Sequence, residues 1–265
     1  MKIQTAYCTD KGNVKEVNQD ALLIKTASTS IGEIAFIAIC DGMGGLEKGE
    51  MASSMMIRGL GQWFKTELPR LLLKEHYEES IFSSLNNIIL NTNETLMQYG
   101  QENCIKVGTT LTAMLIIDTR YFVVHVGDTR LYELTSQEGI QITKDHTLVA
   151  MEVEQNKLTL EEAERDPRKN LLLQCIGASK NLQPDFIQGE VKTNATYLIC
   201  CDGFRHKITL EEMRQAFTNV EINSEAKLFD ECQRLVELNK ARAERDNITV
   251  VVLQFDDTSR EIHSC

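Results

Sequence analysis

Residues 34–40 form an apolar run without a turn residue, and a glycine-rich segment follows at once. Such a run predicts a buried strand. The residues after it are Asp41-Gly42-Met43-Gly44-Gly45. A carboxylate at the end of a buried strand, beside glycine backbone that can approach a ligand closely, suits a hard cation or a phosphate. The same residues also suit a tight turn closed by the Asp41 side chain. Other strand-end carboxylates are therefore needed to choose between the two interpretations.

In the rest of the chain, apolar residues recur either at every second position or at helical spacing. This pattern predicts groups of strands that alternate with groups of helices. Residues 21–25 are expected to pair with residues 34–40 as a hairpin. Strands are predicted at 3–8, 21–25, 34–40, 109–118, 121–126, 131–134, 140–143, 197–201 and 248–255. Helices are predicted at 47–67, 81–96, 210–217 and 225–242. Residues 148–168 are polar, with Thr159 as a helix N-cap, and predict an exposed, lid-like excursion.

Composition limits the classes of partner. The 265 residues contain only three prolines and no linker-like tract, which favours one compact domain over residues 1–265. A net charge of −11 argues against nucleic acid or an anionic membrane as the main partner. The longest apolar runs are too short to span a bilayer, and the first residues do not resemble a signal peptide. The eight cysteines include no C-x-x-C pair, which indicates reduced core thiols and a cytoplasmic location.

Five aspartates stand at the ends of predicted strands. They are Asp20, Asp41, Asp128, Asp202 and Asp246, and two of them are followed directly by glycine. Any one could be an ordinary strand-end residue, because aspartate is depleted within strands. Gathered together, however, five carboxylates would repel one another unless cations neutralise them. Oxygen ligands without histidine favour Mg²⁺ or Mn²⁺, and two such ions sharing a carboxylate can activate water for phosphoester hydrolysis. Spacing alone leaves open whether the five converge.

The chain resembles the metal-dependent protein phosphatases, the type 2C serine/threonine phosphatases, in their bacterial form. The matching pieces run in the family's order from about residue 3 to 255. They are Gly12-Asn13-Val14-Lys15-Glu16-Val17-Asn18-Gln19-Asp20, Asp41-Gly42-Met43-Gly44-Gly45, Gly108-Thr109-Thr110, Val126-Gly127-Asp128-Thr129-Arg130, Asp145-His146-Thr147, Cys201-Asp202-Gly203-Phe204 and Asp246-Asn247-Ile248-Thr249-Val250. Each piece alone is weak, but the ordered set is specific.

The resemblance implies an α+β fold: a four-layer α-β-β-α sandwich of two central antiparallel sheets flanked by helices, with the site at one end. It implies that Asp41 bridges two Mn²⁺ or Mg²⁺ ions and that Asp20 acts mainly through bound water. Asp202 and Asp246 would complete one ion's protein ligands, and the Gly42 carbonyl would hold the other ion. A third, weaker ion would bind between Asp128 and Asp202. The excursion, at about residues 147–170, would be the family's flap.

Three departures from the family pattern affect the chemistry. Lys15 replaces the usual phosphate-binding arginine, so it is expected to supply charge without a planar two-point contact. Met43 stands where many eukaryotic relatives carry the histidine credited with protonating the leaving group. His146 is a stand-in candidate for that role but is expected to be structural. Arg205 and His206 depart from the commoner sequence after Asp-Gly and are substrate-contact candidates.

The leading hypothesis is therefore a metal-dependent serine/threonine phosphoprotein phosphatase in which metal-activated water attacks phosphorus directly. Asp41, Asp20 and Lys15 are its expected catalytic residues. It would act as a monomer and oppose a bacterial Ser/Thr kinase in signalling. Two alternatives remain: a catalytically silent regulatory module of the same fold, and a hydrolase of small phosphoesters.

Overall fold

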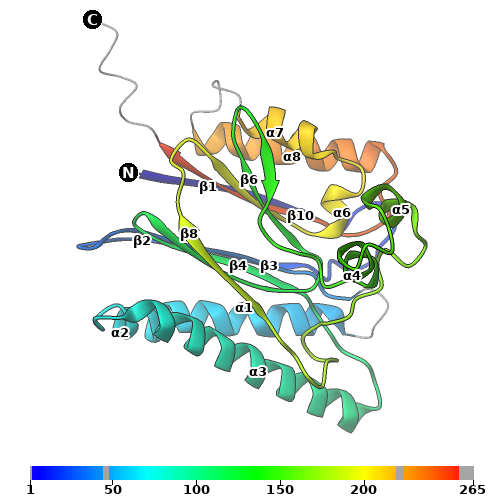
Figure 1. The fold of residues 1–265 in the computed structure, drawn as a ribbon, viewed down its shortest axis with the longest axis horizontal. Coiled ribbons are helices and arrows are strands. Elements are labelled where there is room, and N and C mark those ends of the chain that lie inside the picture. Colours follow the sequence, from blue (N-terminus) through cyan, green and yellow to red (C-terminus); the bar gives the residue numbers. More distant parts are fainter. Residues whose placement is uncertain (1, 44–47, 219–223, 257–265) are drawn as a thin grey trace, which may run out of the picture.

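The computed structural model describes residues 2–43, 48–218 and 224–256. Two five-stranded antiparallel sheets pack face to face, and helices cover the outer face of each sheet (Figure 1). The prediction of an α+β, four-layer sandwich is confirmed. Among the described residues, no helix is both long and apolar enough to cross a membrane.

The first sheet has the order β1-β10-β9-β6-β7. Its central strands, β10 and β9, are buried along their length because both faces are covered, so they read as continuous apolar runs. The strands are β1 (Lys2–Asp10), β10 (Ile248–Asp256), β9 (Thr196–Cys200), β6 (Arg130–Leu134) and β7 (Gly139–Gln141).

The second sheet has the order β2-β3-β4-β5-β8. Its strands are β2 (Ala21–Thr29), β3 (Gly32–Cys40), β4 (Leu111–Ile117), β5 (Arg120–Val126) and β8 (Asp185–Glu190). The predicted hairpin is present, with Ala21 opposite Cys40. That register makes Asp20 and Asp41 the next residues along the two strands, so the hairpin itself sets these carboxylates side by side.

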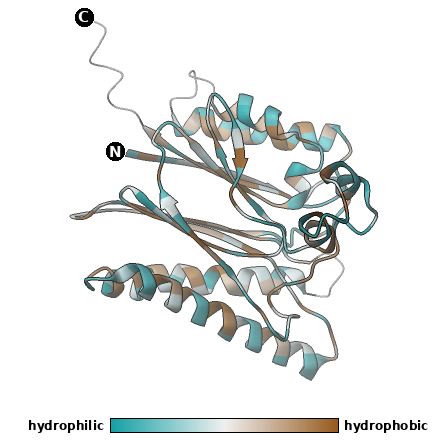
Figure 2. Cartoon of the chain, in the orientation of Figure 1, coloured by the Kyte–Doolittle hydropathy of each residue, from teal (hydrophilic) through white to brown (hydrophobic). Residues whose placement is uncertain are grey.

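Three helices cover the second sheet: α1 (Gly49–Thr66), α2 (Leu68–Leu71) and α3 (Tyr77–Asn103). Three others cover the first: α6 (Asp202–Arg205), α7 (Leu210–Phe217) and α8 (Glu225–Ala241). The excursion carries α4 (Leu148–Glu154) and α5 (Leu160–Arg165) at one end of the sandwich. Its α5 turn is coloured hydrophilic in Figure 2, in agreement with the exposed polar excursion expected from the sequence.

The core has three layers. Between the sheets, Ile37, Val123, Tyr197 and Val251 belong to one cluster. The second cluster joins the second sheet to its helices, and the third joins the first sheet to α7 and α8. Apolar side chains fill most of both faces of the two sheets, and the five aspartates singled out from the sequence lie beyond the strand ends.

Several short elements were not predicted from the sequence, among them α2 at Leu68–Leu71. Strand β8 is a polar edge strand that pairs with β5, and α6 is a single helical turn that begins at Asp202. The predicted helix at 47–67 corresponds to α1, but Glu47 lies outside the described residues, as do Gly44 and Gly45 of the first glycine-rich segment.

Candidate metal centre

Each sheet contributes carboxylates to one end of the sandwich. Asp20 precedes β2 and Asp41 follows β3 in the second sheet, whereas Asp202 follows β9 and Asp246 precedes β10 in the first. The charges of Asp20, Asp202, Asp128 and Asp246 all raise the pKa of Asp41, so the five predicted carboxylates lie at the same end of the sandwich, and Asp20 and Asp41 approach each other within 4.8 Å. The convergence that spacing left open is therefore a property of this fold.

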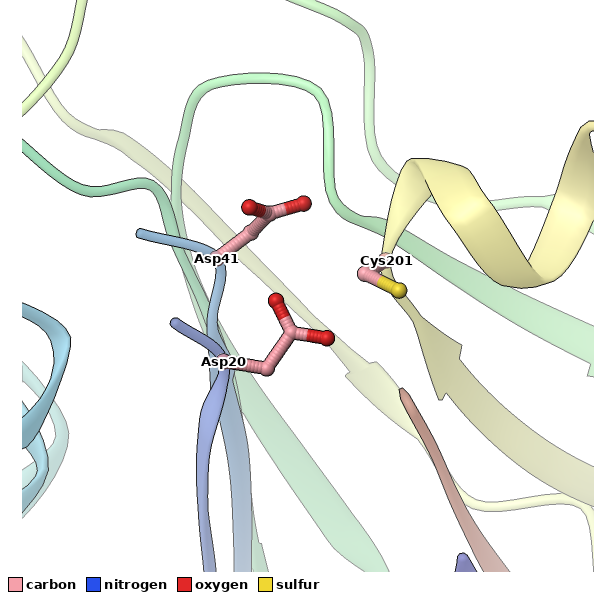
Figure 3. A group of neighbouring side chains, drawn as sticks. All are labelled: Asp20, Asp41 and Cys201. Atoms are coloured by element: carbon pink, nitrogen blue, oxygen red, sulfur yellow. The ribbon is translucent and has the colours of Figure 1, made fainter. Parts of the chain in front are cut away.

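Asp20 and Asp41 form the centre of this group (Figure 3). Their carboxylate oxygens and the Cys201 sulfur include atoms that lie within 4.8 Å of one another. Both oxygens of Asp20 are buried, and neither has a hydrogen-bond partner among the described residues. Buried carboxylate oxygens are seldom left unpaired, because the lost hydration costs free energy. The pair is thus arranged for a ligand that supplies positive charge.

Burial dominates the electrostatics of this pair. It raises the pKa of Asp20 to about 7; the neighbouring side chains of Thr249 and Cys201 act in the opposite direction, and the charges of Asp202 and Asp246 add to the rise. Burial also raises the pKa of Asp41 well above its usual range, and the neighbouring carboxylate of Asp20 adds to the rise. A cation bound between the two groups would reverse this balance by favouring both ionised forms.

Cys201 was interpreted from sequence as a core thiol, but its side chain borders the carboxylates (Figure 3). Its sulfur accepts a hydrogen bond from the Thr249 amide at 3.1 Å and donates to the Asn247 carbonyl at 3.4 Å. Burial raises the pKa of this thiol well above its usual range. The donor set directed at the centre is therefore oxygen, which suits Mg²⁺ or Mn²⁺.

The backbone around Asp41 is held by short contacts. The Gly42 amide donates to the Gln19 carbonyl at 3.1 Å, and the Asp41 amide donates to the Thr110 hydroxyl at 3.0 Å. A Cβ at Gly42 would lie 2.5 Å from the Gln19 carbonyl oxygen, so only glycine fits. Met43 is held to Gly108 by a backbone hydrogen bond of 3.1 Å.

The first sheet's two aspartates each contact a basic side chain. Lys15 Nζ lies 2.7 Å from Asp246 Oδ1. His206 Nε2 lies 3.5 Å from Asp202 Oδ2, and His206 Nδ1 lies 3.5 Å from a carboxylate oxygen of Glu244. Lys15 and His206 therefore contact predicted metal ligands in this structure.

Asn247 fixes the loop that carries Lys15. Its side-chain oxygen accepts from the Gln19 amide at 2.9 Å, and its amide group donates to the carbonyls of Lys11 and Val17. Gly203 packs so closely that an added Cβ would lie 2.0 Å from the Asn247 carbonyl oxygen. Asn247 was quoted in a sequence motif, but its positioning role could not be inferred from that motif.

Asp128 stands on the link between β5 and β6 and contacts Arg205. Arg205 Nη2 donates to the Asp128 carbonyl oxygen at 3.1 Å and to Asp128 Oδ2 at 3.3 Å. Burial, with the charge of Asp202, raises the pKa of Asp128 to about 7, although Arg205 acts in the opposite direction. Arg205 was predicted as a substrate contact, and here its guanidinium is directed at a predicted metal ligand.

Asp145 completes this part of the site. Arg130 donates to it through Nε at 2.9 Å and through Nη2 at 2.7 Å, a two-point contact. Burial alone would raise the pKa of Asp145, but the hydrogen bonds and charge of Arg130 hold it below its usual range. Arg205 Nη2 also lies 3.8 Å from Asp145 Oδ2. The sequence analysis quoted Asp145 in a motif without assigning it a partner.

His146 is engaged on both ring nitrogens. Its Nδ1 accepts from the Gly127 amide at 3.2 Å, and its Nε2 lies 3.1 Å from Asp185 Oδ2. Its backbone amide donates to the Gly127 carbonyl at 2.7 Å. These contacts tie the start of the excursion to the β5–β6 link, in agreement with the structural role expected for His146.

Comparison with known proteins gives consistent results. A family model described as protein phosphatase 2C matches residues 11–243. Protein phosphatase PhpP of Streptococcus pneumoniae is 29% identical over 263 residues, covering 98% of this chain and 100% of the relative. The crystal structure of the serine/threonine phosphatase Stp1 from Staphylococcus aureus is 26% identical with a TM-score of 0.82, covering 97% of this chain and 96% of that one.

A further solved structure is the catalytic domain of the serine/threonine phosphatase PstP in complex with two manganese ions. It is 29% identical with a TM-score of 0.76, and the match covers 96% of this chain and 99% of that one. The family match extends over most of the chain, and the predicted resemblance is confirmed. The chain belongs to the protein phosphatase 2C family.

Proposed function

We propose that this protein hydrolyses phosphoserine and phosphothreonine in protein substrates with two Mg²⁺ or Mn²⁺ ions held at the Asp20–Asp41 centre. Membership of the family makes the chain a protein phosphatase, and the residue roles are the proposed part. One observation carries them: both buried oxygens of Asp20 lack a partner among the described residues, beside the half-buried carboxylate of Asp41. This donor set fits hard divalent cations.

The proposed ligands are those expected from the family. Asp41 would bridge the ions, Asp20 would act through bound water, and Asp202 and Asp246 would hold one ion. The Gly42 carbonyl would hold the other. When bound, such ions supply an activated water and offset charge on the phosphoryl oxygens. The protein's own part is to bring carboxylates from two sheets to one place and to hold them in a buried setting.

Lys15 is proposed to contact the substrate phosphate. It is paired with Asp246 at 2.7 Å. A cation on Asp246 would weaken that pairing by competing for the same carboxylate, which leaves the ammonium free to turn to a phosphoryl oxygen. Lys15 would then neutralise substrate charge when the metals are bound.

The leaving-group proton is proposed to come from water. Met43 carries no titratable group, and both ring nitrogens of His146 are engaged by Gly127 and Asp185. His206 faces Asp202 and Glu244, which favours a role in orienting Asp202 over a role in binding substrate. Arg205 faces Asp128 in the same way.

The wider setting is also proposed. Residues 1–265 would form a single domain, with the flap at about 147–170 bordering the site. The protein would act as a monomer in the cytoplasm and oppose a bacterial Ser/Thr kinase. The names of the relatives, which are serine/threonine phosphatases, support phosphoproteins as the substrate class.

The test is hydrolysis of p-nitrophenyl phosphate and of a phosphothreonine peptide, with and without Mn²⁺, by the wild type and by Asp41→Asn. We expect metal-dependent turnover of both substrates by the wild type alone. No turnover with Mn²⁺ or Mg²⁺ would favour the silent regulatory module. Turnover of the small ester, with none of any phosphopeptide or phosphoprotein, would favour the small-phosphoester hydrolase.

A further inference from the structure

We propose that Arg205 takes the place beside Asp128 that the family resemblance gives to a third metal ion, so that this chain binds two ions and excludes the third. The inference rests on the proposed two-ion centre and concerns its stoichiometry. The expected third site does not fit a free cation, because the buried Arg205 guanidinium donates to both the carbonyl and the carboxylate of Asp128. The Lys15–Asp246 pair, by contrast, is partly exposed, so a cation can replace the lysine there.

The contact between Arg205 and Asp128 has two parts. Nη2 donates to the Asp128 carbonyl oxygen at 3.1 Å and to the carboxylate at 3.3 Å. The side chains are only 14% and 8% exposed, so little water competes for either group. The bond to the backbone carbonyl does not depend on whether the Asp128 carboxyl is protonated. It therefore holds the guanidinium beside Asp128 in either protonation state.

The position of Arg205 in the chain explains why it blocks this site in particular. It lies three residues after Asp202, in the single helical turn that Asp202 begins. Arg205 therefore extends from α6, which carries the expected ligand Asp202, to Asp128, which is the other expected ligand of the third ion. Asp202 itself faces His206 at 3.5 Å. An ion between the two aspartates would have to displace the Arg205 contact.

The charges at this place are already balanced. Arg130 forms its two-point contact with Asp145, and Arg205 lies 3.8 Å from Asp145 and 3.3 Å from Asp128. The ionised side chains give two positive and two negative charges. A divalent cation added there would face a guanidinium at short range, with only Asp202 left to offset it, and Asp202 is already a proposed ligand of the two-ion centre. At the Asp20–Asp41 pair, by contrast, both oxygens of Asp20 lack a hydrogen-bond partner among the described residues, so a cation there would meet negative charge that is not yet offset.

The test counts bound Mn²⁺ per chain in the full-length protein, by equilibrium dialysis with metal analysis and by the electron paramagnetic resonance signal of free Mn²⁺. We expect the wild type to bind two ions into the millimolar range of free Mn²⁺. Arg205→Gln removes the charge but keeps a polar side chain, and it should add a third, weak ion. Arg205→Lys keeps the charge and should remain at two.

Three controls assign the result. Arg214→Gln removes an arginine paired with Glu211 on α7 and should remain at two ions. The double variant Arg205→Gln with Asp128→Ala should lose the third ion again. Circular dichroism and thermal unfolding check that each variant is folded, and the wild-type count tests the inference without any substitution.

A wild type that binds three ions would overturn the role of Arg205 and leave the proposed phosphatase centre standing. A folded Arg205→Gln variant that binds two ions would overturn it as well. Fewer than two ions on the wild type would overturn both this inference and the two-ion centre. Because these counts differ, the two failures are distinguishable.

Discussion

Two groups of buried carboxylates lie at the same end of the sandwich and are treated differently by the surrounding chain. Asp128 and Asp145 contact Arg205 and Arg130, whereas the oxygens of Asp20 have no partner among the described residues. Burial is common to both groups, so burial alone does not mark a metal site. The distinguishing property is whether the fold supplies its own positive charge. Five predictions test this comparison.

The largest expected effect is loss of activity on the unpaired side. Asp41→Asn removes the proposed bridging carboxylate and should lower metal-dependent turnover by more than the roughly 10–100-fold typical of residues that only support a ligand. The assay is p-nitrophenyl phosphate hydrolysis at saturating Mn²⁺. Asp118→Asn, in the turn between β4 and β5, is the matched control and should leave the rate unchanged. Equal rates for Asp41→Asn and wild type would contradict the site.

On the paired side the effect should appear in stability. Asp145→Ala leaves the Arg130 guanidinium without its two-point partner and should lower the free energy of unfolding by about 3 kcal/mol. Urea unfolding of the metal-free protein measures this. Asp185→Ala is the control, because that carboxylate is partly exposed and pairs with a histidine. A loss no larger than in the control would show that the arginines do not depend on Asp145.

Replacing Asp20 is expected to raise the free energy of unfolding of the metal-free protein. Metal-free Asp20→Asn should be more stable than wild type at pH 8, by on the order of 1 kcal/mol, because a neutral amide is cheaper to bury than an unpaired carboxylate. Saturating Mn²⁺ should reverse the order, since only the wild type offers the charged ligand. Thermal unfolding with and without Mn²⁺ measures both. If metal-free Asp20→Asn were less stable than the wild type, the Asp20 carboxylate would not be an unpaired charge, and the contrast with Asp128 and Asp145 would be wrong.

The same reasoning gives a pH dependence. Burial raises the pKa of Asp20 and of Asp128 to about 7 in the folded protein. Because both values lie above those of the unfolded chain, the folded state binds more protons between about pH 4 and pH 7. Burial lowers the pKa of His125 to about 4, which acts in the opposite direction in this window, but the two carboxyls outweigh this one group. The metal-free protein should therefore lose stability as pH rises through this window, and Mn²⁺ should reduce the slope. A metal-free stability that rises across that range would contradict the assigned shifts.

The smallest expected effect concerns Lys15. Lys15→Arg adds a second donor towards phosphate and should lower KM by about fivefold, which corresponds to the roughly 1 kcal/mol of a typical net hydrogen bond, with kcat nearly unchanged. Steady-state kinetics with a phosphothreonine peptide separates the two constants. Lys11→Arg, on the same loop, is the control. A change in kcat with constant KM would place Lys15 in the chemical step instead.

Much of the fold could be predicted because local signals agreed with the tertiary structure. Helix α7 was predicted at its observed bounds, since Thr209 forms a capping box with Glu212 in front of an amphipathic run. The β2–β3 hairpin followed from two apolar runs with one turn between them. Strand β8 was missed because an edge strand with one neighbour has a polar sequence, and α6 was missed because one turn has no period to detect.

Some features of the candidate site could also be predicted from the sequence, and others could not. The five aspartates could be found because each stands at a strand end, where the residue order alone indicates the position. The partners of Asp128 could not, because the contact with Arg205 joins residues 77 positions apart and depends on how α6 is placed. Cys201 was assigned to the core because its apolar neighbours give no sign that its sulfur borders the carboxylates.

The origin of the carboxylates in two different sheets has a consequence for the molecule as a whole. Asp20 and Asp41 move with the second sheet, and Asp202 and Asp246 move with the first. Any slippage between the layers alters the distance across which a cation is shared. Metal affinity therefore depends on how the two sheets are aligned. A substitution at Val123 or Val251 in the inter-sheet cluster should weaken Mn²⁺ binding even where the protein remains folded.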